Sequence, residues 1–179
     1  MRSAFLRLGA GWRMLAILAD SHGRHMQTRF IMLGIESSCD DTAAAIVCDD
    51  KTILANNVAS QMDMHADYGG VVPEVAARAH LDVIDQVING ALADAGLSIA
   101  EIDGVAATGG PGLIGGGLVG TVTAKAIALA RGIPYFAVNH LEGHALSGRL
   151  TDEVSFPYLL LLVSSKNNEK AHLLLKVLI

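Results

Sequence analysis

Near the middle of the chain stands the stretch Ile102-Asp-Gly-Val-Ala-Ala-Thr-Gly-Gly-Pro-Gly-Leu-Ile-Gly-Gly-Gly117. Residues 102–107 have the apolar composition of a buried strand, and a helix-forming segment follows the glycines over about residues 118–130. The free N–H groups and the dipole at the start of such a helix attract anions. The stretch therefore predicts an α/β fold with a phosphate-receiving loop after one strand.

The glycine pattern is less specific than this geometry. Gly110, Gly112 and Gly115 match the Gly-x-Gly-x-x-Gly of dinucleotide-binding proteins, but the pattern does not follow the first strand, and no acidic residue stands about 20 residues on. The Gly-Lys-Ser/Thr of a P-loop is also missing. Two roles remain open, which are phosphate binding and close packing of the helix on the strand.

Upstream, three apolar runs at residues 31–39, 43–48 and 52–58 predict an antiparallel meander. The sequence Asp40-Asp41-Thr42 predicts the first turn, which is either a place to hold metal-bound phosphate or a plain solvated turn. A polar loop over residues 61–72 then leads to a helix that begins at Pro73 and ends before Gly96. We expect His80, within this helix, to be a core or surface residue.

Downstream, residues 133–138 predict a strand that ends at two histidines, His140 and His144. Positions i and i+4 share one face of a helix, so both imidazoles can reach one divalent metal ion. Glu142 points about 200° away from that face and is a poor general base for a metal-bound water. A solvated or capping histidine pair remains the alternative. Residues 156–163 form the last clear strand.

Composition and charge limit the classes of function. Hydrophobic residues make up 51% of the 179 residues and aromatic residues 4%, which is typical of α/β proteins. Beyond residue 30 the chain has 8 basic and 17 acidic residues, so a basic surface for nucleic acid must come from elsewhere. Cys39 and Cys48 indicate a reduced, intracellular protein.

A membrane association is not expected. Residues 104–124 carry no charge, but their glycines and Pro111 break a spanning helix. Residues 1–31 are rich in arginine and poor in acid, which indicates a mis-assigned start, with Met26 or Met32 as true starts, or else an organelle transit peptide. We expect a cytoplasmic protein, with the mitochondrion as the alternative.

Four motifs in this order closely resemble one family: Gly34-Ile-Glu-Ser-Ser-Cys-Asp-Asp-Thr42, His65-Ala-Asp-Tyr-Gly-Gly-Val-Val-Pro-Glu74, Gly110-Pro-Gly-Leu-Ile-Gly115 and Asn139-His-Leu-Glu-Gly-His-Ala145. The family is the tRNA N6-adenosine threonylcarbamoyltransferases, formerly called O-sialoglycoprotein endopeptidases or glycoproteases. The resemblance covers residues 33–164.

The resemblance implies an actin-like, Hsp70-like ATPase (ribonuclease H-like) fold, in which a mixed sheet has an antiparallel meander and then βαβ units. It implies transfer of threonylcarbamoyl from threonylcarbamoyl-AMP to N6 of the adenosine beside the tRNA anticodon. It also implies a bound iron or zinc ion, and partners that include tRNA and further subunits, one of them a paralogous lobe.

The resemblance also assigns site residues. His140 and His144 match metal ligands, and Asp40 and Asp41 match the acidic pair at the catalytic cleft. The glycines Gly110, Gly112 and Gly115 match the substrate-binding loop, and the run Leu162, Val163 and Ser164 matches a second substrate contact.

After Ser164 the family continues Gly-Gly-His, whereas this chain reads Ser165-Lys-Asn-Asn-Glu-Lys170. We therefore expect an extension at 1–31, an N-terminal lobe at 32–164 and an aberrant tail at 165–179 in place of the second lobe. Catalytic metal sites generally use three protein ligands, so two histidines alone predict weak metal retention and no transfer activity. The alternatives are a non-catalytic dimerisation or regulatory lobe and the metalloendopeptidase of the older name.

Overall fold

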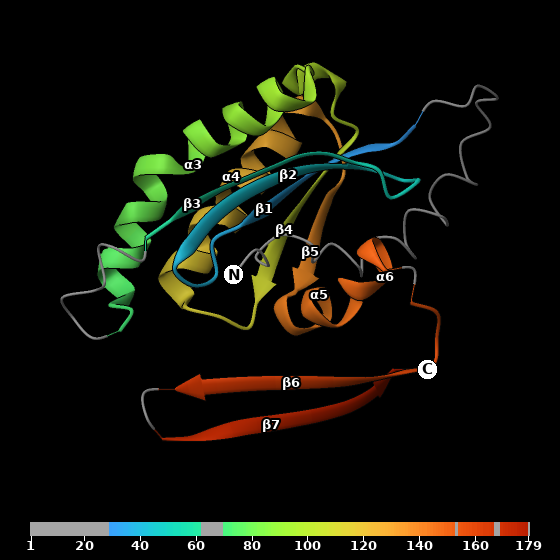
Figure 1. The fold of residues 1–179 in the computed structure, drawn as a ribbon. Helices are drawn as coiled ribbons and strands as arrows, with labels where there is room; N and C mark the ends of the chain where they lie inside the picture. The colour runs from blue at the N-terminus through green and yellow to red at the C-terminus, as the bar shows by residue number, and fades with distance from the viewer. Residues whose placement is uncertain (1–28, 62–69, 153, 167–168, 179) are drawn as a thin grey trace.

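The computed structural model describes residues 29–61, 70–152, 154–166 and 169–178 (Figure 1). Its main sheet has five strands in the order β3-β2-β1-β4-β5. These strands are β1 (Ile31–Glu36), β2 (Asp41–Cys48), β3 (Ile53–Ser60), β4 (Gly104–Gly110) and β5 (Tyr135–Asn139). The helices are α3 (Pro73–Ala95), the 3-10 helix η2 (Ile99–Glu101), α4 (Ile114–Arg131), α5 (His140–Leu146) and α6 (Gly148–Thr151), and a separate hairpin pairs β6 (Tyr158–Lys166) with β7 (Glu169–Leu178).

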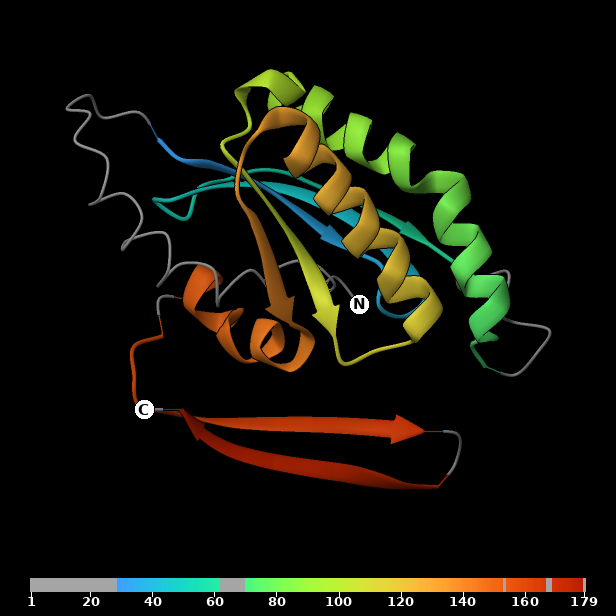
Figure 2. The same ribbon diagram turned by 180° about the vertical axis from the view of Figure 1, so that it is seen from behind.

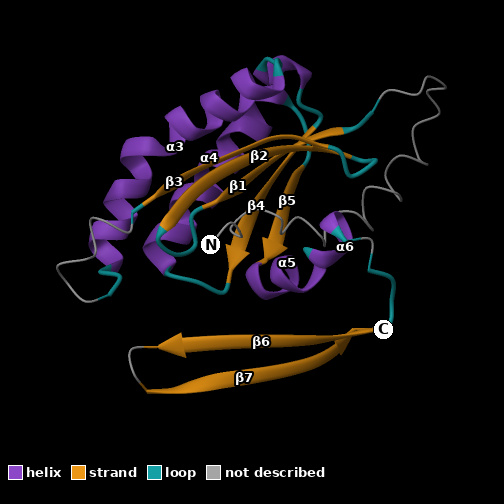
Figure 3. Ribbon diagram, in the orientation of Figure 1, coloured by secondary structure: helices purple, strands orange, loops and turns teal. Residues whose placement is uncertain are grey.

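The pairing of the strands confirms the predicted mixed sheet. β2 is antiparallel to both β1 and β3, whereas β1, β4 and β5 run parallel to one another. Figure 3 shows the helical connections between the parallel strands. Because parallel strands end at the same edge of a sheet, the segments that follow β1, β4 and β5 meet there.

Helices α3 and α4 lie together on one face of the sheet (Figure 2). The apolar side of α3 is buried against the sheet. The helix ends before Gly96, as predicted, and the φ of Gly96 is 66°, in the left-handed region. Leu33, Ile35 and Ile46 supply the centre of the core and are almost fully buried. Burying each such side chain stabilises the fold by about 1.5–3 kcal/mol.

The structure corrects the predicted turn and helix start. Asp41 and Thr42 are the first residues of β2 instead of turn residues, and β1 ends at Glu36. Helix α4 begins at Ile114 rather than near residue 118, so three glycines predicted as loop are helical. Glycine inside a helix costs about 1 kcal/mol relative to alanine, and close packing at some of these positions offsets that cost.

The chain outside the predicted strands also differs from expectation. Residues 165–179, for which no strand was predicted, contribute β7, whose Leu173 pairs with Val163 of β6. Both hairpin strands lie on the side toward which the carboxyl ends of β4 and β5 point (Figures 1 and 2). β1 starts at Ile31, within the segment predicted as an extension. The rest of that segment, residues 1–28, and most of the polar loop, residues 62–69, lie outside the described residues.

In the part of the chain that the structure describes, no helix combines the length and the apolar character that crossing a bilayer requires.

Candidate functional site

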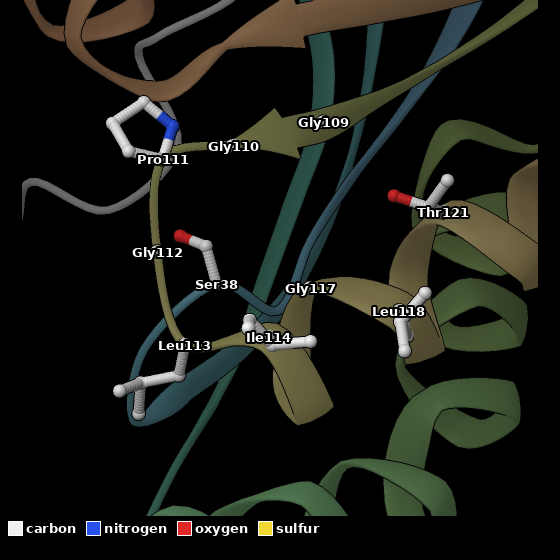
Figure 4. Close-up of a pocket in the computed structure, with 10 residues that line it drawn as sticks. All are labelled: Ser38, Gly109, Gly110, Pro111, Gly112, Leu113, Ile114, Gly117, Leu118 and Thr121. Carbon is white, nitrogen blue, oxygen red and sulfur yellow. The ribbon is translucent and has the colours of Figure 1, made fainter.

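A pocket of about 320 Å³ lies where β4 gives way to α4 (Figure 4). Its lining comes from the glycine loop, the first turns of α4 and the turn after β1. The lining residues are Ser38, Gly109, Gly110, Pro111, Gly112, Leu113, Ile114, Gly117, Leu118 and Thr121. Gly110 has a φ of 122°, a backbone conformation that residues other than glycine rarely adopt. We call this cavity the glycine pocket.

The start of α4 makes the glycine pocket suitable for an anion. Leu113 precedes the helix, and its side chain cannot cap the N–H groups of the first turn. These groups and the helix dipole favour a negatively charged oxygen at this end. The lining is otherwise apolar or backbone, apart from the hydroxyls of Ser38 and Thr121, and the Thr121 hydroxyl donates to the carbonyl oxygen of Thr108 at 3.3 Å.

Several glycines serve packing, which was the second predicted role. A Cβ on Gly112 would lie 2.8 Å from the carbonyl oxygen of Ser38, and one on Gly116 would lie 2.5 Å from that of Ser37. Gly115 does not line the pocket, and a Cβ there would lie 3.0 Å from Cβ of Ala77 on α3. Of the three glycines predicted to bind substrate, Gly110 and Gly112 therefore line the pocket and Gly115 lies between helices.

The turn after β1 is bonded tightly to α4. Ser37 Oγ donates to the carbonyl oxygen of Gly116 at 2.7 Å and accepts from the N–H of Gly120 at 2.9 Å. The N–H of Leu113 donates to the carbonyl oxygen of Ser38 at 2.9 Å. These bonds fix the position of Ser38 at the wall of the glycine pocket.

The two predicted histidines converge at the start of α5. Asn139 caps this helix, because its side-chain oxygen accepts from the N–H groups of Leu141 at 3.0 Å and Glu142 at 3.2 Å. The Nε2 atoms of His140 and His144 are 3.0 Å apart, with the rings nearly perpendicular at 78°. Glu142 is exposed, in agreement with its predicted direction away from the pair.

A buried carboxylate supports the first histidine. His140 Nδ1 lies 2.9 Å from Ser38 Oγ and 3.8 Å from Glu36 Oε2. Glu36 is 7% exposed, and its carboxylate accepts hydrogen bonds from the N–H of Ser38 at 2.6 Å and from the hydroxyl of Thr108. Burial alone raises the pKa of Glu36, but the interactions with His140, Ser38 and Thr108 outweigh it and lower the pKa to about 2.

This arrangement fits a metal ion that the family implies. Two ligand nitrogens at about 2.1 Å from one tetrahedral ion are about 3.4 Å apart, so a small rotation of either ring would bring the histidine pair from 3.0 Å to that spacing. Metal-binding histidines commonly hold their other ring nitrogen against a carboxylate or another polar oxygen, as His140 does. No group of three or more His, Cys, Asp or Glu side chains suited to a metal occurs within the described ranges, so the pair could offer an ion two ligands there.

His80 of α3 supports the turn after β1. His80 is fully buried, with Nε2 at 3.1 Å from the carbonyl oxygen of Cys39 and Nδ1 at 2.7 Å from Thr42 Oγ1 and 3.2 Å from Gln61 Nε2. A carbonyl oxygen only accepts, so Nε2 carries a proton. The amide nitrogen of Gln61 only donates, so Nδ1 accepts and the ring is neutral. Of the two places predicted for His80, the core is correct.

Burial lowers the pKa of His80 below its ordinary value of 6.5. The hydrogen bond to the Cys39 carbonyl and the charges of Glu36, Asp40 and Asp41 act in the opposite direction and do not overcome the effect of burial. His80 is thus a neutral support of the turn.

The remaining predicted site residues lie elsewhere. Asp40 and Asp41 are half-buried beside the His80 side of the turn and do not line the glycine pocket, and the backbone carbonyl of Asp40 accepts from the N–H of Gln61. Leu162, Val163 and Ser164 are consecutive residues of β6 in the hairpin. The catalytic role of the aspartates and the substrate-binding role of the β6 residues stay predictions.

Sequence reasoning missed Glu36, Ser38 and Thr108, which connect the two parts of the site. One signal was present, because Glu36 is an acid at the end of an apolar run that predicts a buried strand. A buried acid needs partners, and such partners gather where parallel strands end.

Comparison with known proteins gives a family and a fold for this chain. A family model described as TsaD, tRNA N6-adenosine threonylcarbamoyltransferase, matches residues 52–175. Curated proteins of that name are 62% identical over 135 residues in Erythrobacter litoralis (75% of this chain, 39% of the relative) and 61% identical over 134 residues in Paramagnetospirillum magneticum (75% and 39%). A relative from Chelativorans sp. is 59% identical over 145 residues (79% and 40%). The chain thus spans about two-fifths of the length of these curated relatives.

Solved structures identify the fold. YeaZ from Pseudomonas aeruginosa superposes with a TM-score of 0.56 at 15% identity, covering 83% of this chain and 67% of that chain. A protein described as uncharacterized, with similarity to peptidase YEAZ from Pseudomonas aeruginosa, gives 0.53 at 16%, covering 83% and 66%. This likeness confirms the predicted actin-like ATPase fold. Since the family model matches more than half of the chain, the chain belongs to the tRNA N6-adenosine threonylcarbamoyltransferase family, a family of transferases.

Proposed function

We propose that this chain supplies the glycine pocket and the histidine pair of an enzyme that transfers threonylcarbamoyl from threonylcarbamoyl-AMP to N6 of the adenosine beside the tRNA anticodon. One observation carries the proposal, which is that both parts of the site meet at Ser38. Its side chain lines the glycine pocket and its Oγ lies 2.9 Å from His140 Nδ1. An adenylate phosphate in the pocket would therefore lie beside the metal ligands.

We assign a role to each group of site residues from its chemistry. The N–H groups of the first turn of α4 and the hydroxyl of Ser38 bind the phosphate of the adenylate. His140 and His144 would hold an iron or zinc ion, which when bound would polarise the threonylcarbamoyl carbonyl or anchor the substrate hydroxyls. Asp40 and Asp41 serve as the acidic pair of the cleft, and Leu162, Val163 and Ser164 contact the adenylate from β6.

Partners follow from charge and ligand number. The chain beyond residue 30 has a net charge of −9, so the basic surface for tRNA comes from other subunits or other parts of the enzyme. Two histidines leave a metal ion short of a third protein ligand, which has to come from outside the described residues. We propose a paralogous lobe among the partners, and cytoplasm as the location, with the mitochondrion as the alternative.

A chimera tests the proposal. The matching segment of the Erythrobacter litoralis relative is replaced by the corresponding segment of this chain, and formation of threonylcarbamoyladenosine is measured on tRNA. We expect an active chimera, activity reduced at least about a hundredfold by His140→Ala, and little effect of Glu142→Gln. An inactive but folded chimera, or one indifferent to His140→Ala, contradicts the proposal.

The two rival functions receive less support. A metalloendopeptidase of the His-Glu-x-x-His type needs a glutamate directed at the metal-bound water, whereas Glu142 is exposed. A non-catalytic dimerisation or regulatory lobe needs no metal ligands, and the supported orientation of His140 by Glu36 and Ser38 favours a metal-binding role.

A further inference from the structure

Glu36 is a buried carboxylate next to the histidine pair, and its acceptor atoms are all engaged. Oε1 accepts from the N–H of Ser38 at 2.6 Å, and Oε2 accepts from the hydroxyl of Thr108. Oε2 also lies 3.8 Å from His140 Nδ1. Donors on both sides hold the group ionised and in place, so a fixed negative charge faces one nitrogen of the His140 ring.

The hydrogen bond between His140 and Ser38 is by itself compatible with two tautomers. A hydroxyl both donates and accepts, so Ser38 Oγ can face either an N–H or a lone pair at Nδ1. The carboxylate of Glu36 removes this ambiguity, because a negative charge attracts an N–H group and repels a lone pair. Nδ1 therefore carries the proton, and the lone pair of His140 is at Nε2, which faces Nε2 of His144 at 3.0 Å.

We propose that Glu36 is a positioning residue that holds His140 in the Nδ1–H tautomer and so presents the Nε2 lone pair to a divalent metal ion shared with His144. The metal part of this inference rests on the proposed function. The tautomer itself follows from the contacts of Glu36, Ser38 and His140, and it can be measured without a metal ion.

The same assignment reaches the glycine pocket. When Nδ1–H of His140 donates to Ser38 Oγ, the proton of the Ser38 hydroxyl is left to another acceptor. Ser38 lines the pocket, and Figure 4 shows its oxygen directed toward the stretch that holds Pro111 and Gly112. The Glu36 carboxylate is one such acceptor, because a side-chain interaction with Ser38 lowers its pKa, and an anionic oxygen bound in the glycine pocket would be a second.

The first measurement is the ring nitrogen chemical shifts of His140, recorded by NMR at neutral pH on metal-free protein. We expect an N–H-type signal for Nδ1 and a lone-pair-type signal for Nε2. Glu36→Gln keeps the size of the side chain but turns an amide N–H₂ toward the ring, which shifts the population toward the Nε2–H tautomer. Glu142→Gln removes an exposed carboxylate of α5 that does not contact the Nδ1 side of the ring, so the wild-type tautomer persists.

The second measurement is zinc affinity by competition with a coloured chelator. We expect Glu36→Gln to weaken binding by about 10- to 100-fold, Glu36→Asp to restore part of it, and Glu142→Gln, an exposed carboxylate on α5, to leave it unchanged. His140→Ala gives the background. Circular dichroism establishes that each variant is folded.

The outcomes separate the two claims. A wild-type His140 in the Nε2–H tautomer overturns the inference, and this result needs no variant to fold. A folded Glu36→Gln with the wild-type tautomer overturns it as well. If the tautomers behave as expected but the wild type binds no zinc above the His140→Ala background, the positioning role of Glu36 stands and the metal role in the proposed function is contradicted.

Discussion

Ser38 Oγ lies 2.9 Å from His140 Nδ1, although 102 positions separate the two residues in the chain. The contact forms because β1, β4 and β5 are parallel and end at one edge of the sheet. Ser38 follows β1, the glycine loop follows β4 and His140 follows β5. A single hydroxyl thus joins the candidate anion site to the candidate metal ligands.

Adjacent serines with different partners offer a matched test of this contact. Ser38→Ala removes the hydroxyl between His140 and the glycine pocket, whereas Ser37→Ala removes two buried hydrogen bonds to α4. We expect Ser37→Ala to lower the free energy of unfolding by about 1–3 kcal/mol in urea titrations. Ser38→Ala should cost less stability but weaken zinc binding several-fold in chelator competition. The reverse pattern would contradict the assigned contacts.

Two neighbouring glycines of α4 should respond oppositely to alanine. A Cβ on Gly116 would lie 2.5 Å from the Ser37 carbonyl oxygen and 3.0 Å from His80 Nε2, whereas a Cβ on Gly117 would meet no atom within 4 Å. We expect Gly117→Ala to stabilise the protein by about 0.5–1 kcal/mol through helix propensity. Gly116→Ala should destabilise it by about 1–3 kcal/mol through overpacking. Thermal or urea unfolding measures both, and equal effects would argue against the packing described for α4.

Acid should destabilise the protein partly through His80. Its pKa is lower in the folded protein than the ordinary 6.5, so the unfolded chain binds the proton first as the pH falls. The contribution of neutral His80 to the free energy of unfolding is therefore complete above about pH 6.5. It is lost as the pH falls through the folded-state pKa of His80. His80→Gln can keep the bond to the Cys39 carbonyl but does not titrate.

The check compares the free energy of unfolding of wild type and His80→Gln between about pH 8 and pH 5. We expect the wild type to lose more stability over this range than the variant. Parallel pH profiles for the two proteins would show that His80 is not the group responsible.

The start of α5 should depend on its cap. Asn139 accepts from two N–H groups of the helix, and the same helix carries both histidines. We expect Asn139→Ala to lower the free energy of unfolding by about 1 kcal/mol and to weaken zinc binding, because the histidines lose their fixed spacing. Asn139→Asp keeps the acceptor and should retain both properties. Similar losses in the two variants would indicate that the cap does not set the geometry of the pair.

Much of the fold was predictable because local patterns agree with the sheet. The sequence pattern indicates the meander of the first three strands. It also indicates the apolar stripe of α3, with Pro73 at the start of the helix and Gly96 after its end. The convergence of His140 and His144 was also predictable, since it follows from helical spacing.

The parts that escaped prediction depend on contacts between distant segments. Helix α4 begins at Ile114, among glycines that read as loop, because the turn after β1 packs against them. Glu36 and Thr108 are 72 positions apart, and their contact follows from the parallel pairing of β1 with β4. Spacing along the chain therefore identified the two histidines but not the carboxylate and hydroxyl that orient them.

Metal binding by the histidine pair is best measured by zinc titration of the wild type beside His140→Ala and Glu142→Gln. Two histidines bind zinc weakly, so a titration detects binding that metal analysis of the purified protein would miss. A zinc site at the histidine pair predicts measurable binding by wild type and Glu142→Gln, and affinity at least about tenfold weaker for His140→Ala. Equal affinities in all three proteins, or no binding by the wild type, would contradict it.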